Sequence, residues 1–192
     1  MNTLVKFSAA SVLAAAFAAP ALAAPKTFTV DPTHTFASFA YNHMGLSKQQ
    51  SRFNNTTGTI VYDAAAKTGS VEIEIDMASV DTGSDKFNEH IKSDDFFDVA
   101  KYPKATYKSK RVVFKGGKPV AVEGELTIKD VTKPVRLVID SFSAKEHPLK
   151  RVEAIGANGH MKIKRSEFNA GKFAPAVGDD VTISVSLEAL VQ

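Results

Sequence analysis

The segment Val71-Glu72-Ile73-Glu74-Ile75-Asp76-Met77 alternates apolar and acidic residues without a break. A period of two is that of a β-strand with one face against a core and the other in water. The odd-numbered residues of this strand are therefore predicted to face inward. No other stretch of the chain assigns its two faces so clearly.

Working outward from this strand, similar but less regular patterns extend over most of the chain. Short connections join them, and Gly116-Gly117 permits the positive φ angles of a hairpin turn. Such long strands favour a closed barrel. The sequence predicts an all-β fold, an extended antiparallel barrel of about eight strands. The predicted strands are Lys26–Val30, His34–Met44, Arg52–Tyr62, Val71–Met77, Ala105–Phe114, Val120–Ile128, Val131–Phe142, Val152–Arg165 and Val181–Val191.

One stretch, Lys86–Pro103, interrupts the run of strands. Phe87 and Ile91 lie one helical turn apart, and the apolar pair Phe96-Phe97 follows them. This spacing predicts a short helix with one apolar edge, which would act as a lid on the barrel. A helix that only closes the bottom of the barrel is the alternative.

The first 23 residues read as a targeting segment. A positive charge at Lys6 precedes an apolar run that ends in Ala21-Leu22-Ala23, the small-x-small pattern of a signal peptidase site. Cleavage is expected after Ala23, which leaves residues 24–192 as one exported domain. The chain has no cysteine that could carry a lipid anchor, and no later stretch has the roughly 20 apolar residues of a membrane helix.

Charge and motif content argue against several classes of function. The 24 Lys and Arg residues are scattered and nearly balanced by 21 Asp and Glu, so no nucleic-acid partner is expected. No nucleophile elbow is present, so the sequence predicts no enzyme and no catalytic residue. The five histidines lack the close spacing of a metal site, so no metal is predicted; they are His34, His43, His90, His147 and His160.

Several motifs, in order and spacing, resemble those of the YceI-like family, secreted lipid-binding proteins of lipocalin-like shape. The clearest is Glu89–Asp98 followed by Tyr102-Pro103. The others are Asp31-Pro32-Thr33-His34-Thr35, the run Gly124–Val135, and Arg165-Ser166-Glu167-Phe168. One departure is Asp130, which stands where a glycine is common and is expected to adopt the left-handed conformation.

The resemblance implies a periplasmic carrier that encloses an amphiphilic isoprenoid lipid, either a polyprenyl phosphate or an isoprenoid quinone, with its head group near the lid. No cofactor other than this ligand is expected. A homodimer could form at an edge left open beside the final strand. Side chains on the strands and lid are predicted to contact the ligand: Phe39, His43, Phe53, Phe97, Tyr102, Phe114 and Phe168.

Two alternatives remain open at this level. One is a stress-related protein whose barrel is solidly packed and encloses no ligand. The other is an enzyme that modifies a lipid head group, with His34, His43 or His90 as the base. The two faces of His34–Met44 both mix apolar and polar residues, so the sequence does not decide which of them faces inward.

Overall fold

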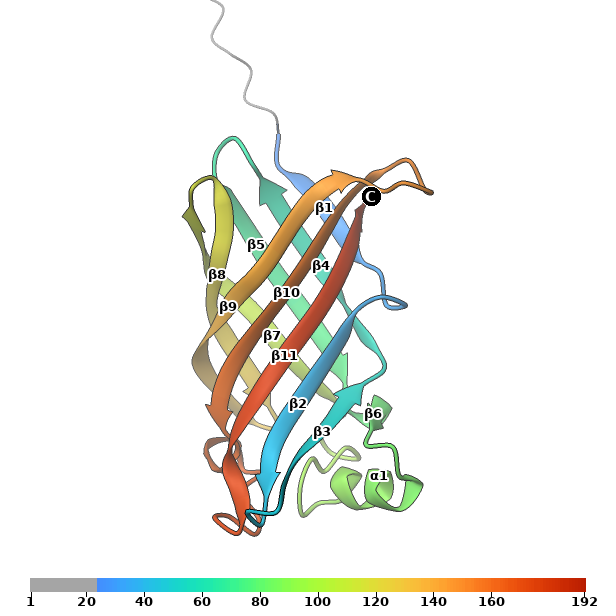
Figure 1. Cartoon of the computed structure of the whole chain (residues 1–192), viewed down its shortest axis with the longest axis vertical. Helices are drawn as coiled ribbons and strands as arrows, with labels where there is room; N and C mark the ends of the chain where they lie inside the picture. Colours follow the sequence, from blue (N-terminus) through green and yellow to red (C-terminus); the bar gives the residue numbers. More distant parts are fainter. Residues whose placement is uncertain (1–23) are drawn as a thin grey trace, which may run out of the picture.

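A computed structural model describes residues 24–192, and the predicted signal peptide lies outside these residues. Within them the chain forms one antiparallel sheet of 11 strands. Eight strands close into a barrel in the order β1-β4-β5-β7-β8-β9-β10-β11, because β1 also pairs with β11 (Figure 1). The predicted all-β fold, a closed antiparallel barrel of about eight strands, is confirmed.

The strand bounds differ little from the predicted ranges at most positions. The strands are β1 Lys26–Val30, β2 Phe36–His43, β3 Ser47–Phe53, β4 Thr56–Asp63, β5 Thr68–Asp76, β6 Val80–Asp81, β7 Lys104–Lys115, β8 Lys118–Ile128, β9 Val131–Glu146, β10 Glu153–Lys164 and β11 Val177–Val191. The α-helix is α1, Asp85–Lys92, and two short 3-10 helices are η1, Met77–Ser79, and η2, Arg165–Phe168.

Strand β11 has one partner in the upper part of the barrel and another in the lower part. Its residues up to Ser186 pair with β2, whereas Ala189 to Val191 pair with β1. At the change of partner the buried Thr35 hydroxyl donates to the Glu188 carbonyl and accepts from the Glu188 amide, both at 3.1 Å. With β10 on its other side, β11 is paired on both edges, so the open edge predicted beside the final strand is absent.

The predicted strand Arg52–Tyr62 is in fact two strands. β3 pairs with β2 and β6, and β4 pairs with β1 and β5, so the chain must change neighbours between them. Asn54 and Asn55 make this change, and their amides donate to the backbone carbonyl and hydroxyl of Ser79, each at 3.0 Å. Threonines, which favour strands, follow the break at once at Thr56 and Thr57, so the sequence pattern does not reveal it.

Two local predictions also need correction. The left-handed residue between β8 and β9 is Lys129, at φ 56°, and not Asp130, whose carboxylate instead accepts from the Asn169 amide at 3.1 Å. The last strand was predicted to begin at Val181, but β11 begins at Val177 and includes Asp179 and Asp180, where a bulge shifts the register between Val177 and Val181.

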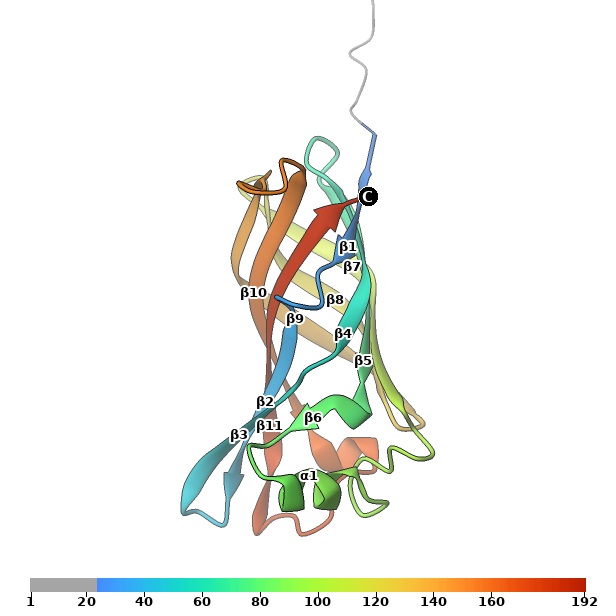
Figure 2. The same ribbon diagram turned by 90° about the vertical axis from the view of Figure 1, so that its right-hand side faces the viewer.

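Helix α1 lies across the lower end of the barrel, opposite the C-terminus (Figure 2). Ile91 is 6% exposed, and Phe87 packs against the same apolar cluster. The predicted apolar edge of the helix therefore faces the barrel. We call residues 85–99, the helix and the turns after it, the lid.

Candidate functional site

The barrel encloses a cavity of about 580 Å³ that is lined by strands, the lid and the 169–176 loop between η2 and β11. Most of its lining is apolar, including Ile73, Leu126 and Ile183. An interior that keeps this much space is not the solidly packed barrel of the alternative hypothesis. The cavity is thus the candidate site.

Strand β2 places its odd-numbered residues toward the cavity. Ala37, Phe39, Tyr41 and His43 all line it, and Phe39 and Tyr41 are only 9% and 8% exposed. The reason is that the large aromatic side chains of β2 occupy odd positions, apart from Phe36, which lies under the Arg52 guanidinium at 4.7 Å. Burial of those aromatic rings decides the face that the sequence pattern left open.

The lid is held on the barrel by aromatic contacts. The ring centroid of Phe97 lies 5.9 Å from that of Phe39, edge to face, and 5.8 Å from that of Phe53. Phe39 and Phe53 also contact each other at 5.6 Å. These three rings join β2, β3 and the lid at the lower end of the cavity.

A second set of contacts holds the lid from the opposite side. The Phe96 ring lies 6.1 Å from that of Phe173 in the 169–176 loop, and Lys172 of the same loop forms an ion pair with Asp95. His90 packs edge-on against Phe96 at 5.1 Å. The lower end is therefore closed by the lid and this loop together.

Arg165 explains how the 169–176 loop keeps its shape. Its guanidinium donates to the carbonyls of Ala170, Lys172, Val177 and Gly178 at 2.5 to 2.9 Å. Burial lowers the pKa of this guanidinium from its ordinary value, and the carbonyls compensate the buried charge.

The aromatic partner in this motif, Phe168, is 1% exposed and lines the cavity. The motif Arg165-Ser166-Glu167-Phe168 thus supplies both the loop anchor and a cavity wall.

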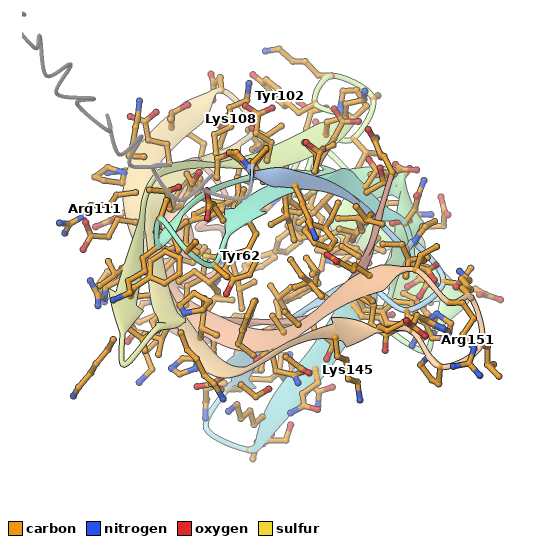
Figure 3. The ribbon with its side chains drawn as sticks, turned by 90° about the horizontal axis from the view of Figure 1, so that it is seen from above. Tyr62, Tyr102, Lys108, Arg111, Lys145 and Arg151 are labelled. Carbon is orange, nitrogen blue, oxygen red and sulfur yellow. The ribbon has the colours of Figure 1, made fainter. Side chains whose placement is uncertain are left out.

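The upper end of the barrel is filled by side chains. Tyr62 points into the barrel (Figure 3), where its ring lies 6.3 Å from that of Phe114 and 5.3 Å from that of Phe142. Tyr62 and Phe142 pack against a buried cluster that includes Phe28 and Ile155. The cavity therefore extends down to the lid and does not reach the C-terminal end of the barrel.

Five of the seven predicted contact residues line the cavity, and two do not. Phe114 packs on Tyr62 above the cavity, and Tyr102 lies on the outside of the barrel (Figure 3), with the Lys101 ammonium 5.0 Å from its ring. Phe114 belongs to a predicted strand and Tyr102 to the predicted lid stretch, and the sequence could not separate either position from one that lines the cavity. The five that line the cavity are Phe39, His43, Phe53, Phe97 and Phe168. Their contact with a ligand remains a prediction.

The cavity contains two polar groups that the sequence did not single out. The buried Tyr107 hydroxyl donates to the carbonyls of Val122 at 2.9 Å or Val135 at 3.1 Å, and burial raises its pKa to about 12. Thr56 is 1% exposed, and its Oγ1 has no hydrogen-bond partner among residues 24–192.

Sequence reasoning also missed Tyr41 and Arg165 as cavity residues. Tyr41 follows Phe39 at the period of two, so strand alternation was the signal that could have identified it.

The histidines lie in different environments and form no common centre. His34 is at the surface, with Nδ1 3.1 Å from the Asp31 carboxylate, so it belongs to the β1–β2 turn and not to the cavity. His43 and His90 both line the cavity. Among residues 24–192 no three His, Asp or Glu side chains are grouped as metal ligands would be.

The hydrogen bond from the Thr33 hydroxyl, followed by that from His34, holds the pKa of Asp31 well below its usual range. The Asp31–Thr35 motif is therefore explained by the turn. No helix in residues 24–192 is long and apolar enough to cross a bilayer.

Comparison with known proteins places these features in a family. The family model for the YceI-like domain matches residues 28–189. A UPF0312 protein of Pectobacterium atrosepticum is 32% identical over 192 residues, covering 100% of this chain and 98% of that protein. The protein YceI of Escherichia coli is 32% identical over 179 residues, 91% of each chain.

Solved structures show the same architecture. The crystal structure of BcnA from Burkholderia cenocepacia matches with a TM-score of 0.68 at 29% identity, over 83% of this chain and 98% of that one. A polyisoprenoid binding domain from Saccharophagus degradans matches with a TM-score of 0.65 at 18% identity, over 86% and 98% respectively, a likeness of fold alone. On the match over residues 28–189 and the full-length relatives, the chain belongs to the YceI-like family.

Proposed function

We propose that this protein is a periplasmic carrier that holds the apolar chain of an isoprenoid amphiphile, a polyprenyl phosphate or an isoprenoid quinone, inside its barrel. The observation that carries the proposal is the cavity of about 580 Å³ with its largely apolar wall. Pockets that bind small molecules have volumes of about 300–1,000 Å³ and few polar groups, and this cavity fits that description.

Burial of a hydrocarbon chain supplies the affinity. Each CH₂ group that leaves water contributes about 0.8 kcal/mol, so a prenyl chain of modest length supports tight binding without any polar contact. The wall suits such a chain, because Ile73, Leu126 and Ile183 offer branched aliphatic surface with no fixed polar pattern. The ligand is thus selected by its shape and apolarity.

The lid supports a function in carrying the ligand through water. Phe97 and Phe96 hold it from two sides, through the Phe39–Phe53 pair and through Phe173. These contacts keep the lower end covered, so a bound chain would remain shielded from solvent. Opening would require the loss of these aromatic contacts, of the Asp95–Lys172 ion pair and of the packing of Ile91, not unfolding of the barrel.

A solved structure of the same fold supports a binding role. The domain from Saccharophagus degradans, which shares this fold, is described as polyisoprenoid-binding. In the present chain the cavity offers a mostly apolar wall against which a hydrocarbon chain can be buried. Two histidines, His43 and His90, also line this cavity.

Mass spectrometry of an organic extract tests the proposal directly. The protein would be purified under mild conditions from a periplasmic fraction, beside an unrelated periplasmic protein from the same preparation. A stoichiometric isoprenoid lipid in the first extract alone is the expected result. An empty extract, together with no uptake of polyprenols or quinones in titrations, would refute the carrier.

A pair of substitutions on β11 tests whether the ligand occupies the cavity. Ile183→Trp adds bulk to a residue that lines the cavity, whereas Ser184→Trp adds the same side chain to the exposed outer face of the strand. The first variant should bind the lipid at least tenfold more weakly, and the second should bind it as the unmodified protein does. Equal binding by both variants would place the ligand outside the barrel.

A further inference from the structure

The wall of the barrel is not hydrogen-bonded along its whole height. The β9–β10 ladder ends at the pair His160↔Val138, although β9 continues down to Val131 and β10 continues to Lys164. Below that pair, β9 keeps its ladder with β8 and β10 keeps its ladder with β11. The lower parts of β9 and β10 therefore face each other without backbone hydrogen bonds.

The sequence at this place explains why the strands separate. If the register of the last pair continued, Arg136 would lie directly opposite Lys162 on the outer face, and like charges in opposite positions destabilise a ladder. Pro134 has no amide hydrogen to donate to a ladder. A bulge between Asn158 and Gly159 shifts the register just before the ladder ends.

A groove of about 570 Å³ occupies the separation. Met161, Ile163 and Phe168 line both this groove and the central cavity, so one layer of side chains divides the two spaces. Phe168 comes from η2 and is 1% exposed. The groove is thus a thin place in the barrel wall that is closed by side chains and not by the sheet.

The rim of the groove is cationic. Lys133, Arg136 and Lys162 line it, against one lining carboxylate, that of Glu167, and the His160 ring lies beside them with Nδ1 2.9 Å from the Asp140 carboxylate. Arg136 forms an ion pair with Glu123 at 2.6 Å, and Lys133 lies 3.7 Å from Glu167. Lys162 is exposed and forms no ion pair with any residue in the part of the chain that the structure describes.

The mouth of the cavity, which is its lower end under the lid, offers fewer unpaired cationic groups to an anion. The Arg165 guanidinium is already bound to four backbone carbonyls, and Lys172 is paired with Asp95. A phosphate at the mouth would have to displace these contacts. At the groove, Lys162 is available to an anion at the surface, next to apolar residues that continue into the cavity. Arg136 beside it binds Glu123 through Nη1, which leaves its other two guanidinium nitrogens as donors.

We propose that this groove binds the anionic head group of an amphiphile whose apolar chain passes between β9 and β10 into the central cavity. The inference rests on the proposed function and narrows it to a phosphate-bearing prenyl lipid in preference to a neutral quinone. The Lys162 ammonium and the Arg136 guanidinium nitrogens that are not bound to Glu123 hold the phosphate oxygens, and the Phe168 ring shifts to admit the chain.

The charge at the groove is tested with two ligands of equal chain, geranylgeranyl phosphate and geranylgeraniol. The double variant Arg136→Gln/Lys162→Gln should bind the phosphate at least tenfold more weakly and the alcohol with unchanged affinity. The control Lys145→Gln/Arg151→Gln removes the same charge from the far end of β9 and the adjoining turn (Figure 3) and should leave both affinities unchanged.

The outcomes separate this inference from the proposed function. If the unmodified protein binds neither ligand, the carrier itself is refuted. If it binds both and the groove variant still binds the phosphate normally, only the groove assignment is overturned. Inorganic phosphate is a third ligand, and its binding as tightly as the lipid phosphate would overturn the assignment to an amphiphile.

A spin label locates the head group independently of affinity. Because the chain has no cysteine, Val138→Cys and Met44→Cys each give one labelling site, on residues 38% and 57% exposed. Val138 lines the groove, whereas Met44 lines the cavity and follows β2 at its lower end. A nitroxide at position 138 should broaden the ³¹P signal of bound geranylgeranyl phosphate more than one at position 44. The reverse order would place the head group at the mouth and overturn the proposal.

Discussion

Replacing Gly124 by alanine should destabilise the barrel, because the Tyr107 ring lies where the new methyl group would go. A Cβ at Gly124 would meet the Tyr107 Cζ at 2.8 Å, its hydroxyl at 2.9 Å and the Lys108 carbonyl at 2.5 Å. Overpacking of a core costs about 1–3 kcal/mol, and each hydrogen bond that Tyr107 loses adds about 0.5–1.5 kcal/mol. The free energy of unfolding should fall by about 2–5 kcal/mol in urea titrations.

Gly156→Ala is the matched control, because a Cβ there would meet nothing within 4 Å. Both glycines lie in strands of the same barrel, β8 and β10. The two variants therefore add the same methyl group and differ only in the space around it. The control should be neutral or more stable by up to about 1 kcal/mol. Equal stability of the two variants would refute the explanation that the absence of a side chain at Gly124 leaves space for the Tyr107 ring.

The hydroxyl titration of Tyr107 gives a second readout for the same variant. Burial raises its pKa to about 12 in the intact barrel. If alanine at position 124 pushes the ring out, this tyrosine should ionise near pH 10, the ordinary value, and the absorbance of tyrosinate would show it. A pKa that stays near 12 in Gly124→Ala would mean that the ring has not moved.

Three further variants probe the lid, the β1–β2 turn and the cavity wall. Phe97→Ala removes two aromatic pairs, each of which contributes about 0.5–1.5 kcal/mol. Amide hydrogen exchange in α1 and release of the lipid should therefore both become faster. An unchanged exchange rate would contradict the packing of the lid. The pKa of Asp31 is lowered in the folded protein, so the ionised carboxylate stabilises the fold above its pKa in the unfolded chain, about 4, and this stabilisation is lost as the pH falls further. Asp31→Asn should therefore be less stable than the unmodified protein at pH 7, and the difference in the free energy of unfolding should be smaller at pH 3. An equal difference at both pH values would refute the turn assignment. Thr56→Val removes a buried hydroxyl without a partner and should raise the melting temperature of the lipid-free protein, whereas a lower one would show that the hydroxyl is bound.

The candidate site was only partly predictable from residue types. Phe39 and Phe97 were expected to contact a ligand, and they do line the cavity. Phe114 was expected beside them but packs on Tyr62, because the upper end of the barrel is filled and the lower end is hollow. Aromatic residues look alike in a sequence whether they fill a core or line a cavity, and only the distance between facing strands separates the two cases.

The sequence by itself determined the fold class, the lid and the family, because these depend on local periodicity and on motifs of fixed spacing. The alternation at Val71–Met77 and the pair Phe87 and Ile91 act within one strand and one helical turn. The tertiary structure alone decided which face of β2 points inward, where β11 changes partner, and where β9 and β10 separate. Each of these depends on residues from different strands meeting across space, as Thr35 and Glu188 do, and no pattern within a single strand records such a meeting.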